Sequence, residues 1–188
     1  FNRTIVVYLH EIGISAASII LYARFMLNSV ISGYSSGVAP VISFNYGRKD
    51  QEQVRFLFRT SLKAVLAGSA LVYLASLLLG DSIVALFASG EPELTEIARH
   101  GIFLFAFSYL FSGVNTFATS LFAALNKGMT AALLAATNTF VFLTASMSIL
   151  PRIGLGADGV WLAAPMAEML CLCLTIFLLR KNKAEFGY

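Results

Sequence analysis

The chain has 188 residues, of which 58% are hydrophobic and only 12% are charged. Soluble domains average about 25% charged residues, so this composition excludes an ordinary soluble domain and indicates a polytopic membrane protein. The formal net charge of +3 fits the orientation of such a protein in its membrane, and we expect no nucleic-acid partner.

Five apolar segments are long enough to cross a bilayer, which takes about 20 helical residues. A shorter apolar segment, residues 4–9, is expected to be the end of a helix, because the sequence begins in mid-pattern without an initiator methionine. We therefore predict an all-α polytopic membrane protein with five full transmembrane helices and the end of a sixth. Residues 1–188 are expected to form a single transmembrane lobe that is truncated at its N-terminus. In chain order, the five long segments are residues 14–46, 56–79, 97–125, 130–150 and 159–179.

The first long segment ends in the stretch SSGVAPVISFNYGRKD, which contains two residues that weaken helices. In lipid, Gly37 and Pro40 predict a kink that neighbouring helices and hydroxyl groups tolerate. We expect the helix to stop around Asn45, with Gly47 in the left-handed conformation of a C-terminal cap.

The connections between the later segments contain residues that indicate turns, loops and helix starts. After residue 79, the stretch GDSIVALF predicts a short interfacial turn or helix that leads into an acidic loop. Pro92 is expected in the first turn of the next helix, where its missing N–H is not needed. The stretch LPRIGLGADG, residues 150–159, has the proline and glycine content of a loop.

Lysine and arginine residues are concentrated in the connections on one side of the predicted helices. With Arg3 and Arg24 left out of the count, the opposite side holds only Arg99 and Arg152, together with most of the acidic residues. Cytoplasmic loops carry an excess of basic residues, so we predict that the basic side and the C-terminus are cytoplasmic, in the plasma membrane. The basic residues counted on that side are Arg48, Lys49, Arg55, Arg59, Lys63, Lys127, Arg180, Lys181 and Lys183.

Glu168 lies in the last segment, roughly 14 Å from its start and therefore near mid-membrane. Ionisable groups at that depth are costly and usually face a cavity or a partner. One interpretation is a carboxylate that binds a proton or a cation, and the other is a structural acid paired with a neighbouring helix. Pro165, just before it, removes a backbone donor and can free a carbonyl near the acid.

Arg24 lies inside the first long segment. Its side chain is long enough to pair with a carboxylate, to contact an anionic group or to reach the membrane interface. A structural pair or an interface role is the favoured interpretation. Pairing with Glu168 is geometrically possible, and the sequence leaves it open.

Polar residues recur at helical spacing in the apolar segments, which places them on single faces. They predict a polar cavity or, equally well, hydrogen bonds and close packing between helices. The candidates for lining a cavity are Ser112, Asn115 and Thr119 in residues 97–125, Asn138 in residues 130–150, and Arg24.

The sequence shows no catalytic constellation, metal-ligand cluster or phosphate loop. Cys171 and Cys173 are two residues apart, a spacing at which helical side chains do not face each other, and we interpret them as packing residues. We therefore expect no enzymatic activity, no metal and no cofactor, apart from Na⁺ or H⁺ as a coupling ion.

The stretch GYSSGVAPVISFNYGRKD resembles multidrug and toxic compound extrusion (MATE) transporters. In that family, the second helix of each six-helix lobe ends in a Gly…Pro…Asn-x-Gly-x-x-(Asp/Asn) pattern. Two further stretches, in the order the family has them, are also similar. FAALNKGMTAALLA resembles the turn between the fourth and fifth helices, and LPRIGLGADGVWLAAPMAEML resembles the loop into the last helix, with Gly-x-x-Gly-x-Trp and an Ala-Glu pair. The residues matching the first pattern are Gly37, Pro40, Asn45, Gly47 and Asp50.

The resemblance covers nearly the whole chain and implies the C-terminal lobe of a twelve-helix transporter. It implies two lobes around a cleft that opens to alternate sides, and export of cationic or amphipathic compounds in exchange for Na⁺ or H⁺. The implied partners are the missing N-terminal lobe, membrane lipid and a small-molecule substrate. Several members carry acids deep in the first and fourth helices of this lobe. Here the fourth helix has only Glu96, at its outer end, which leaves Glu168 as the candidate for ion binding or places coupling in the missing half.

Two other functions compete with drug export. A flippase for lipid-linked substrates belongs to the same broad superfamily, but it would favour a strongly cationic cleft, and only Arg24 is available. A membrane scaffold without transport activity would not need Glu168 at midplane or the polar stripes.

Overall fold

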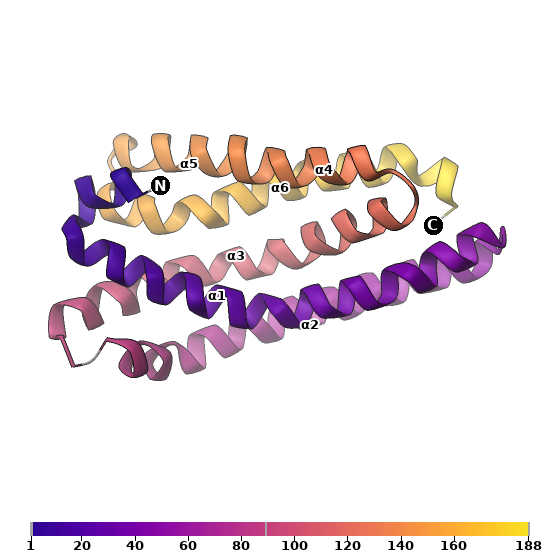
Figure 1. Ribbon diagram of the computed structural model, residues 1–188. Helices are drawn as coiled ribbons and strands as arrows, with labels where there is room; N and C mark the ends of the chain where they lie inside the picture. Colours follow the sequence, from indigo (N-terminus) through magenta and orange to yellow (C-terminus); the bar gives the residue numbers. More distant parts are fainter. Residues whose placement is uncertain (1, 89, 188) are drawn as a thin grey trace.

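The computed structural model describes residues 2–88 and 90–187, which form a bundle of long helices (Figure 1). Within these residues, five helical stretches are long and apolar enough to cross a membrane, which confirms the predicted architecture. One of them is composite: it runs through α4 (Gly128–Ala136), the π-helix η1 (Thr137–Phe142), α5 (Leu143–Ile149) and the 3-10 helix η2 (Leu150–Ile153). The others are α1 (Asn2–Gly47), α2 (Gln51–Phe87), α3 (Pro92–Ala124) and α6 (Gly156–Phe186).

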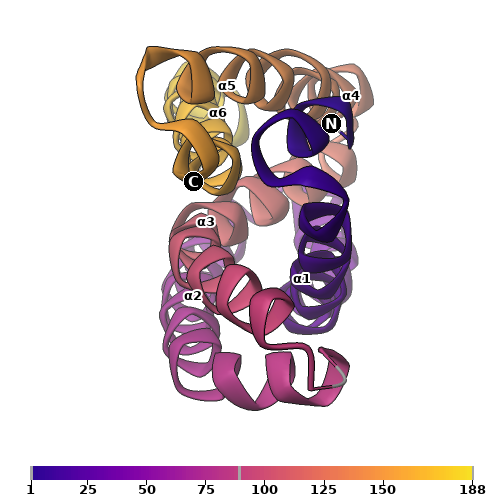
Figure 2. The ribbon, with the colours of Figure 1, turned by 90° about the vertical axis from the view of Figure 1, so that its left-hand side faces the viewer.

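Helix α3 lies at the centre of the bundle. It packs against α1 and α2 on one side and against α6 and α4 on the other (Figure 2). Its sequence is apolar on nearly every face, and large side chains such as Tyr109, Phe117 and Phe122 are almost completely buried. Its polar residues, such as Ser112 and Asn115, are buried as well, and polar side chains in a membrane helix favour contact with other helices over lipid, which accounts for its central place.

The outer surface of the bundle is apolar as well. Phe25, Leu78 and Leu86 each expose more than three quarters of their surface. In a membrane these side chains face lipid, so hydrophobic burial contributes little to helix association. Close packing replaces it: the buried stripe of α2 is built of small and β-branched residues that let the helices approach, namely Val54, Ser61, Val65, Ser69, Val72, Ser76, Gly80 and Val84.

The basic connections meet at one end of the bundle, opposite the described start of the chain (Figure 1). Phe186, near the end of α6, is 1% exposed and packs edge-on against Tyr46 at a centroid distance of 5.4 Å. Lys127 Nζ lies 2.9 Å from Glu185 Oε1, and Arg55 donates to the carbonyl of Gly187. The predicted grouping of these connections is therefore correct, while the side of the membrane that they face stays a prediction.

The predicted break after residues 4–9 is confirmed, because two helices within α1 meet at a kink at His10, whose φ is 57° and ψ −164°. The predicted end of the following helix is wrong. Helix α2 does not end at residue 79 but continues to Phe87, since the stretch GDSIVALF contains no strong helix breaker. Residue 89 of the expected acidic loop lies outside the described residues.

One cap prediction and one loop prediction are also corrected. The left-handed residue after α1 is Lys49, with φ of 60°, and Gly47 is still helical, because the chain closes its turn two residues later than expected. The stretch LPRIGLGADG is mostly helical, and the chain turns there at Gly154 and Gly156, which both have positive φ. Pro92 does lie in the first turn of α3.

Gly159 allows α6 to approach the end of the preceding helix. A Cβ added there would lie 2.6 Å from the backbone nitrogen of Pro151, which cannot rotate aside. We predict that Gly159→Ala lowers the free energy of unfolding by about 1–3 kcal/mol through overpacking. The matched control is Gly68→Ala, because a Cβ at Gly68 meets nothing within 4 Å. Thermal unfolding of the full-length protein in detergent checks this, and equal melting temperatures for the two variants would contradict it.

Candidate functional site

An ion pair joins the first and last helices inside the bundle. Arg24 of α1 lies with Nη2 3.0 Å from Oε1 of Glu168 on α6. The Glu168 side chain is 5% exposed and that of Arg24 is 29% exposed. The Arg24 guanidinium also lies over the ring of Phe105, 5.6 Å from its centroid. The two residues that the sequence analysis left unpaired are therefore partners, 144 positions apart in the sequence.

Asn115 of α3 completes the surroundings of the carboxylate. Its Nδ2 donates to Glu168 Oε2 and to the backbone carbonyl of Glu168, both at 2.9 Å. Thr175, which is fully buried about two turns further along α6, donates its hydroxyl to Asn115 Oδ1 at 2.9 Å. That hydrogen bond fixes which way the amide points, because an amide whose oxygen accepts from a hydroxyl presents its nitrogen to the other side. Each oxygen of Glu168 thus accepts from a donor.

A cavity of about 270 Å³ opens beside this group. Polar side chains from four helices line it, and the π-helix η1 contributes Asn138 and Thr139. A π-helix widens the turn and is frequent at functional sites, because it shifts side chains away from regular helical positions. A smaller cavity of about 100 Å³ adjoins it and shares Arg24, Asn138 and Glu168. The larger cavity is lined by Arg24, Asn28, Asn115, Thr116, Thr119, Ser120, Leu134, Ala135, Asn138, Thr139, Glu168 and Cys171.

Arg24 also borders a second hollow on the outer face of α1. This groove of about 470 Å³ is lined by α1 residues only, among them Asn28, Ser29 and Ser32. The serines, which the sequence places on one helical face, are exposed there. Arg24 therefore reaches the edge of the bundle, while Glu168 stays inside it.

The structure brings most of the candidate residues together. Arg24, Asn115, Thr119, Asn138 and Glu168 share one cavity. Ser112 does not line it, and its hydroxyl lies 3.4 Å from Asn28 Oδ1, which is long for such a hydrogen bond.

The proposed hinge and helix-end residues lie far from this cavity. Helix α1 continues through Gly37 and Pro40 without a non-helical residue. The Asn45 side chain donates to the carbonyl of Val41, and Asp50 caps α2 by accepting from the backbone nitrogen of Gln53. These residues shape the connection between α1 and α2.

Sequence reasoning missed several residues of the site. Thr175 lies seven residues after Glu168 on the same face of α6, a spacing that signals proximity to the acid. Asn28 lies four residues after Arg24 and has the same signal. Nothing in the sequence indicates the π-helix that carries Thr139. Cys171 lines the cavity and Cys173 is exposed, so the two thiols face different surroundings.

A bundle of long apolar helices with a charged pair and a polar cavity in its interior defines a polytopic helical membrane protein. Three solved structures are similar to the chain over 98% of its length at 15% identity. They are a crystal structure of MATE in complex with MaL6 (TM-score 0.91), and an inward-facing and an outward-facing conformation of a multidrug resistance MATE family transporter of the MOP superfamily (TM-scores 0.92 and 0.91). The chain covers only 42–43% of those chains.

The sequence matches the MatE family model over residues 3–150. The chain therefore belongs to the MatE family, which confirms the resemblance seen in the sequence. No curated protein matches it.

The ion pair predicts an asymmetry between two substitutions. Arg24→Gln leaves a carboxylate that is buried without its cation, which costs about 3 kcal/mol or more. Glu168→Gln leaves a guanidinium that is 29% exposed at the edge of the bundle, so its cost is smaller. The double variant Arg24→Gln/Glu168→Gln leaves no unpaired charge. Its loss of unfolding free energy should therefore be smaller than the sum of the losses in the two single variants. Chemical unfolding of the full-length variants measures this, and additive losses of equal size would contradict a coupled pair.

Proposed function

We propose that the chain is the C-terminal lobe of a secondary active transporter that exports cationic or amphipathic drugs and toxic compounds. Export is driven by antiport with Na⁺ or H⁺ across the cell membrane. Membership of the MatE family supports the transport function, and the 42–43% coverage of related structures supports one lobe of two. The N-terminal lobe, membrane lipid and the small-molecule substrate are the partners.

Alternating access in this proposal is a movement of whole lobes. The chain is about equally similar to the inward-facing and the outward-facing relative, with TM-scores of 0.92 and 0.91. A lobe that keeps its shape while the cleft changes sides supports rigid-body rocking around a midplane site. The basic end, with the C-terminus, faces the cytoplasm in this arrangement.

The observation that carries the site is the Arg24–Glu168 pair beside the cavity. Protonation of Glu168 removes its charge and releases Arg24, which breaks the link between α1 and α6. The two protonation states then favour different arrangements of these helices, which is how ion binding shifts a conformational population. Cavity-lining amides and hydroxyls of Asn115, Thr119 and Asn138 contact the transported compound.

The surroundings of Glu168 favour a proton over Na⁺. Sodium needs several oxygen ligands, whereas the groups that touch this carboxylate are N–H donors from Arg24 and Asn115. The amide oxygen of Asn115 already accepts from Thr175. A proton can bind to the Glu168 carboxylate once Arg24 moves away. Sodium would have to bind next to the Arg24 guanidinium, whose positive charge repels it.

The alternative functions find less support. A flippase for phosphate-bearing lipids needs positive charge in its cleft, and the charge of Arg24 is neutralised by Glu168. A scaffold has no need for a buried ion pair beside a polar cavity, because apolar residues of similar volume would be at least as stabilising.

Transport by the full-length protein in vesicles tests the role of Glu168. We predict that Glu168→Gln abolishes the response of substrate efflux to an imposed H⁺ gradient, because the residue can no longer exchange a proton. Glu52→Gln, an exposed acid at the start of α2, is the matched control and should transport normally. Gradient-driven efflux that survives in Glu168→Gln would remove Glu168 from the coupling step, and a response to Na⁺ alone would identify sodium as the ion.

Bending of α1 near its basic end is the second element of the proposal. Pro40 deprives the helix of one backbone hydrogen bond while the helix stays continuous, which leaves it easier to bend there. We predict that Pro40→Ala slows substrate turnover without lowering the melting temperature. Turnover equal to that of the parent protein would mean that Pro40 has only a structural role.

A further inference from the structure

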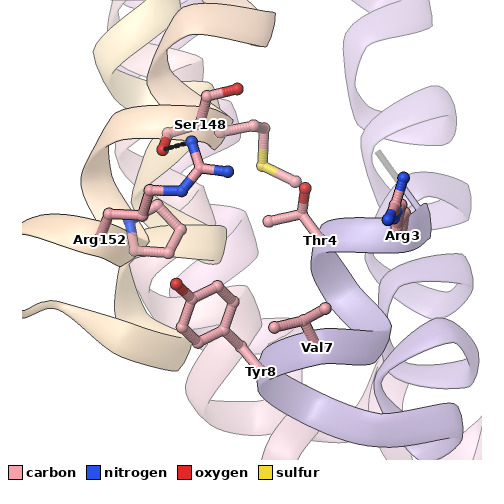
Figure 3. A pocket seen from close by; sticks show the side chains of 8 residues that line it. Arg3, Thr4, Val7, Tyr8, Ser148 and Arg152 are labelled. Atoms are coloured by element: carbon pink, nitrogen blue, oxygen red, sulfur yellow. Dashed lines mark hydrogen bonds between the residues drawn. The ribbon is translucent and has the colours of Figure 1, made fainter.

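A pocket of about 450 Å³ lies between the start of α1 and the end of α5, at the end of the bundle opposite the basic connections (Figure 3). It shares no residue with the cavity beside Glu168. Figure 3 shows Ser148 and Arg152 on one wall and four labelled residues of α1 on the other. The pocket is lined by Arg3, Thr4, Val7, Tyr8, Met147, Ser148, Pro151 and Arg152.

The positive charge of this pocket is not balanced by acids. Elsewhere at this end, Arg99 is paired with Asp81, and His100 Nε2 lies 2.7 Å from Asp158 Oδ1. Arg152 instead donates Nη1 to the carbonyl of Ser148 at 2.9 Å. Within residues 2–88 and 90–187, neither Arg152 nor Arg3 forms an ion pair, and no acid lines the pocket.

The remaining donors and surfaces suit an amphipathic anion. Arg152 uses one of its five N–H donors on Ser148, and the planar fork of a guanidinium matches the oxygens of a phosphate. Hydroxyl groups of Thr4 and Tyr8 stand on the facing wall, and Met147 and Pro151 are buried apolar residues. The ends of membrane-spanning helices lie at the level of the lipid headgroups, where such a ligand is available.

We propose that this pocket binds a phosphate group. Arg152 is the principal contact, Arg3 adds positive charge at the rim, and the hydroxyls of Thr4 and Tyr8 donate to the same group. The phosphate comes from a phospholipid headgroup of the surrounding membrane or from a soluble phosphate. The site depends on the membrane-spanning bundle and is independent of the compound that the protein transports.

Binding to the purified full-length protein in neutral detergent tests the site. The probes are a water-soluble short-chain phosphatidylglycerol, the matching phosphatidylcholine and inorganic phosphate, each titrated by thermal shift and by calorimetry. We expect saturable binding of phosphatidylglycerol, weaker binding of phosphatidylcholine, whose amine offsets the phosphate charge, and no effect of inorganic phosphate if the source is lipid. Binding of inorganic phosphate as tight as that of phosphatidylglycerol would support the same site with a soluble source.

Substitutions locate the binding. Arg152→Gln should weaken phosphatidylglycerol binding roughly tenfold or more, the scale of one lost charge-assisted hydrogen bond. Arg152→Lys keeps the charge but not the fork and should retain part of the affinity, which guards against a folding defect in the first variant. Arg99→Gln removes one positive charge at the same end and should change nothing. No saturable binding of any probe, or equal losses in Arg99→Gln and Arg152→Gln, would overturn the proposal.

Discussion

The ion pair between Arg24 and Glu168 is the constraint on which the interior of this bundle depends. A carboxylate that is 5% exposed in a protein surrounded by lipid is stable only with a cation and hydrogen-bond donors beside it. Arg24 supplies the cation and Asn115 supplies the second donor. Since these groups belong to α6, α1 and α3, the need to compensate one charge fixes three helices relative to one another.

The same constraint accounts for the position of the polar cavity. The cavity lies beside the ion pair, and amides and hydroxyls of the neighbouring helices line it. The π-helix η1 contributes Asn138 to this lining. The polar stripe on α3 both lines the cavity and packs against other helices. Asn115 and Thr119 border the cavity, whereas Ser108 and Ser112 are buried between helices. Ser29, Ser32 and Ser36 of α1 do neither and are exposed.

The motifs that carry the family resemblance have local structural reasons. Asp50 is the N-terminal cap of α2. The number of residues between Asn45 and Asp50 is set by the length of the turn between α1 and α2. Gly159 permits close approach to Pro151, and two residues later Trp161 packs against the position of Gly101, where a Cβ would lie 2.9 Å from its ring. These residues hold helix ends and crossings together. Glu168, the acid of the Ala-Glu pair, instead belongs to the charged interior of the bundle.

The sequence by itself determined the helical class, the number of spanning segments, the basic end and the charged residues of the interior. Those properties follow from composition and periodicity, which are local. Only the tertiary structure decided that Arg24 pairs with Glu168, because a contact across 144 positions depends on how three helices cross. It also decided the exact residues at which the chain turns, His10 and the left-handed Lys49, and the π-helix around Asn138, because the sequence does not mark these conformations at those positions.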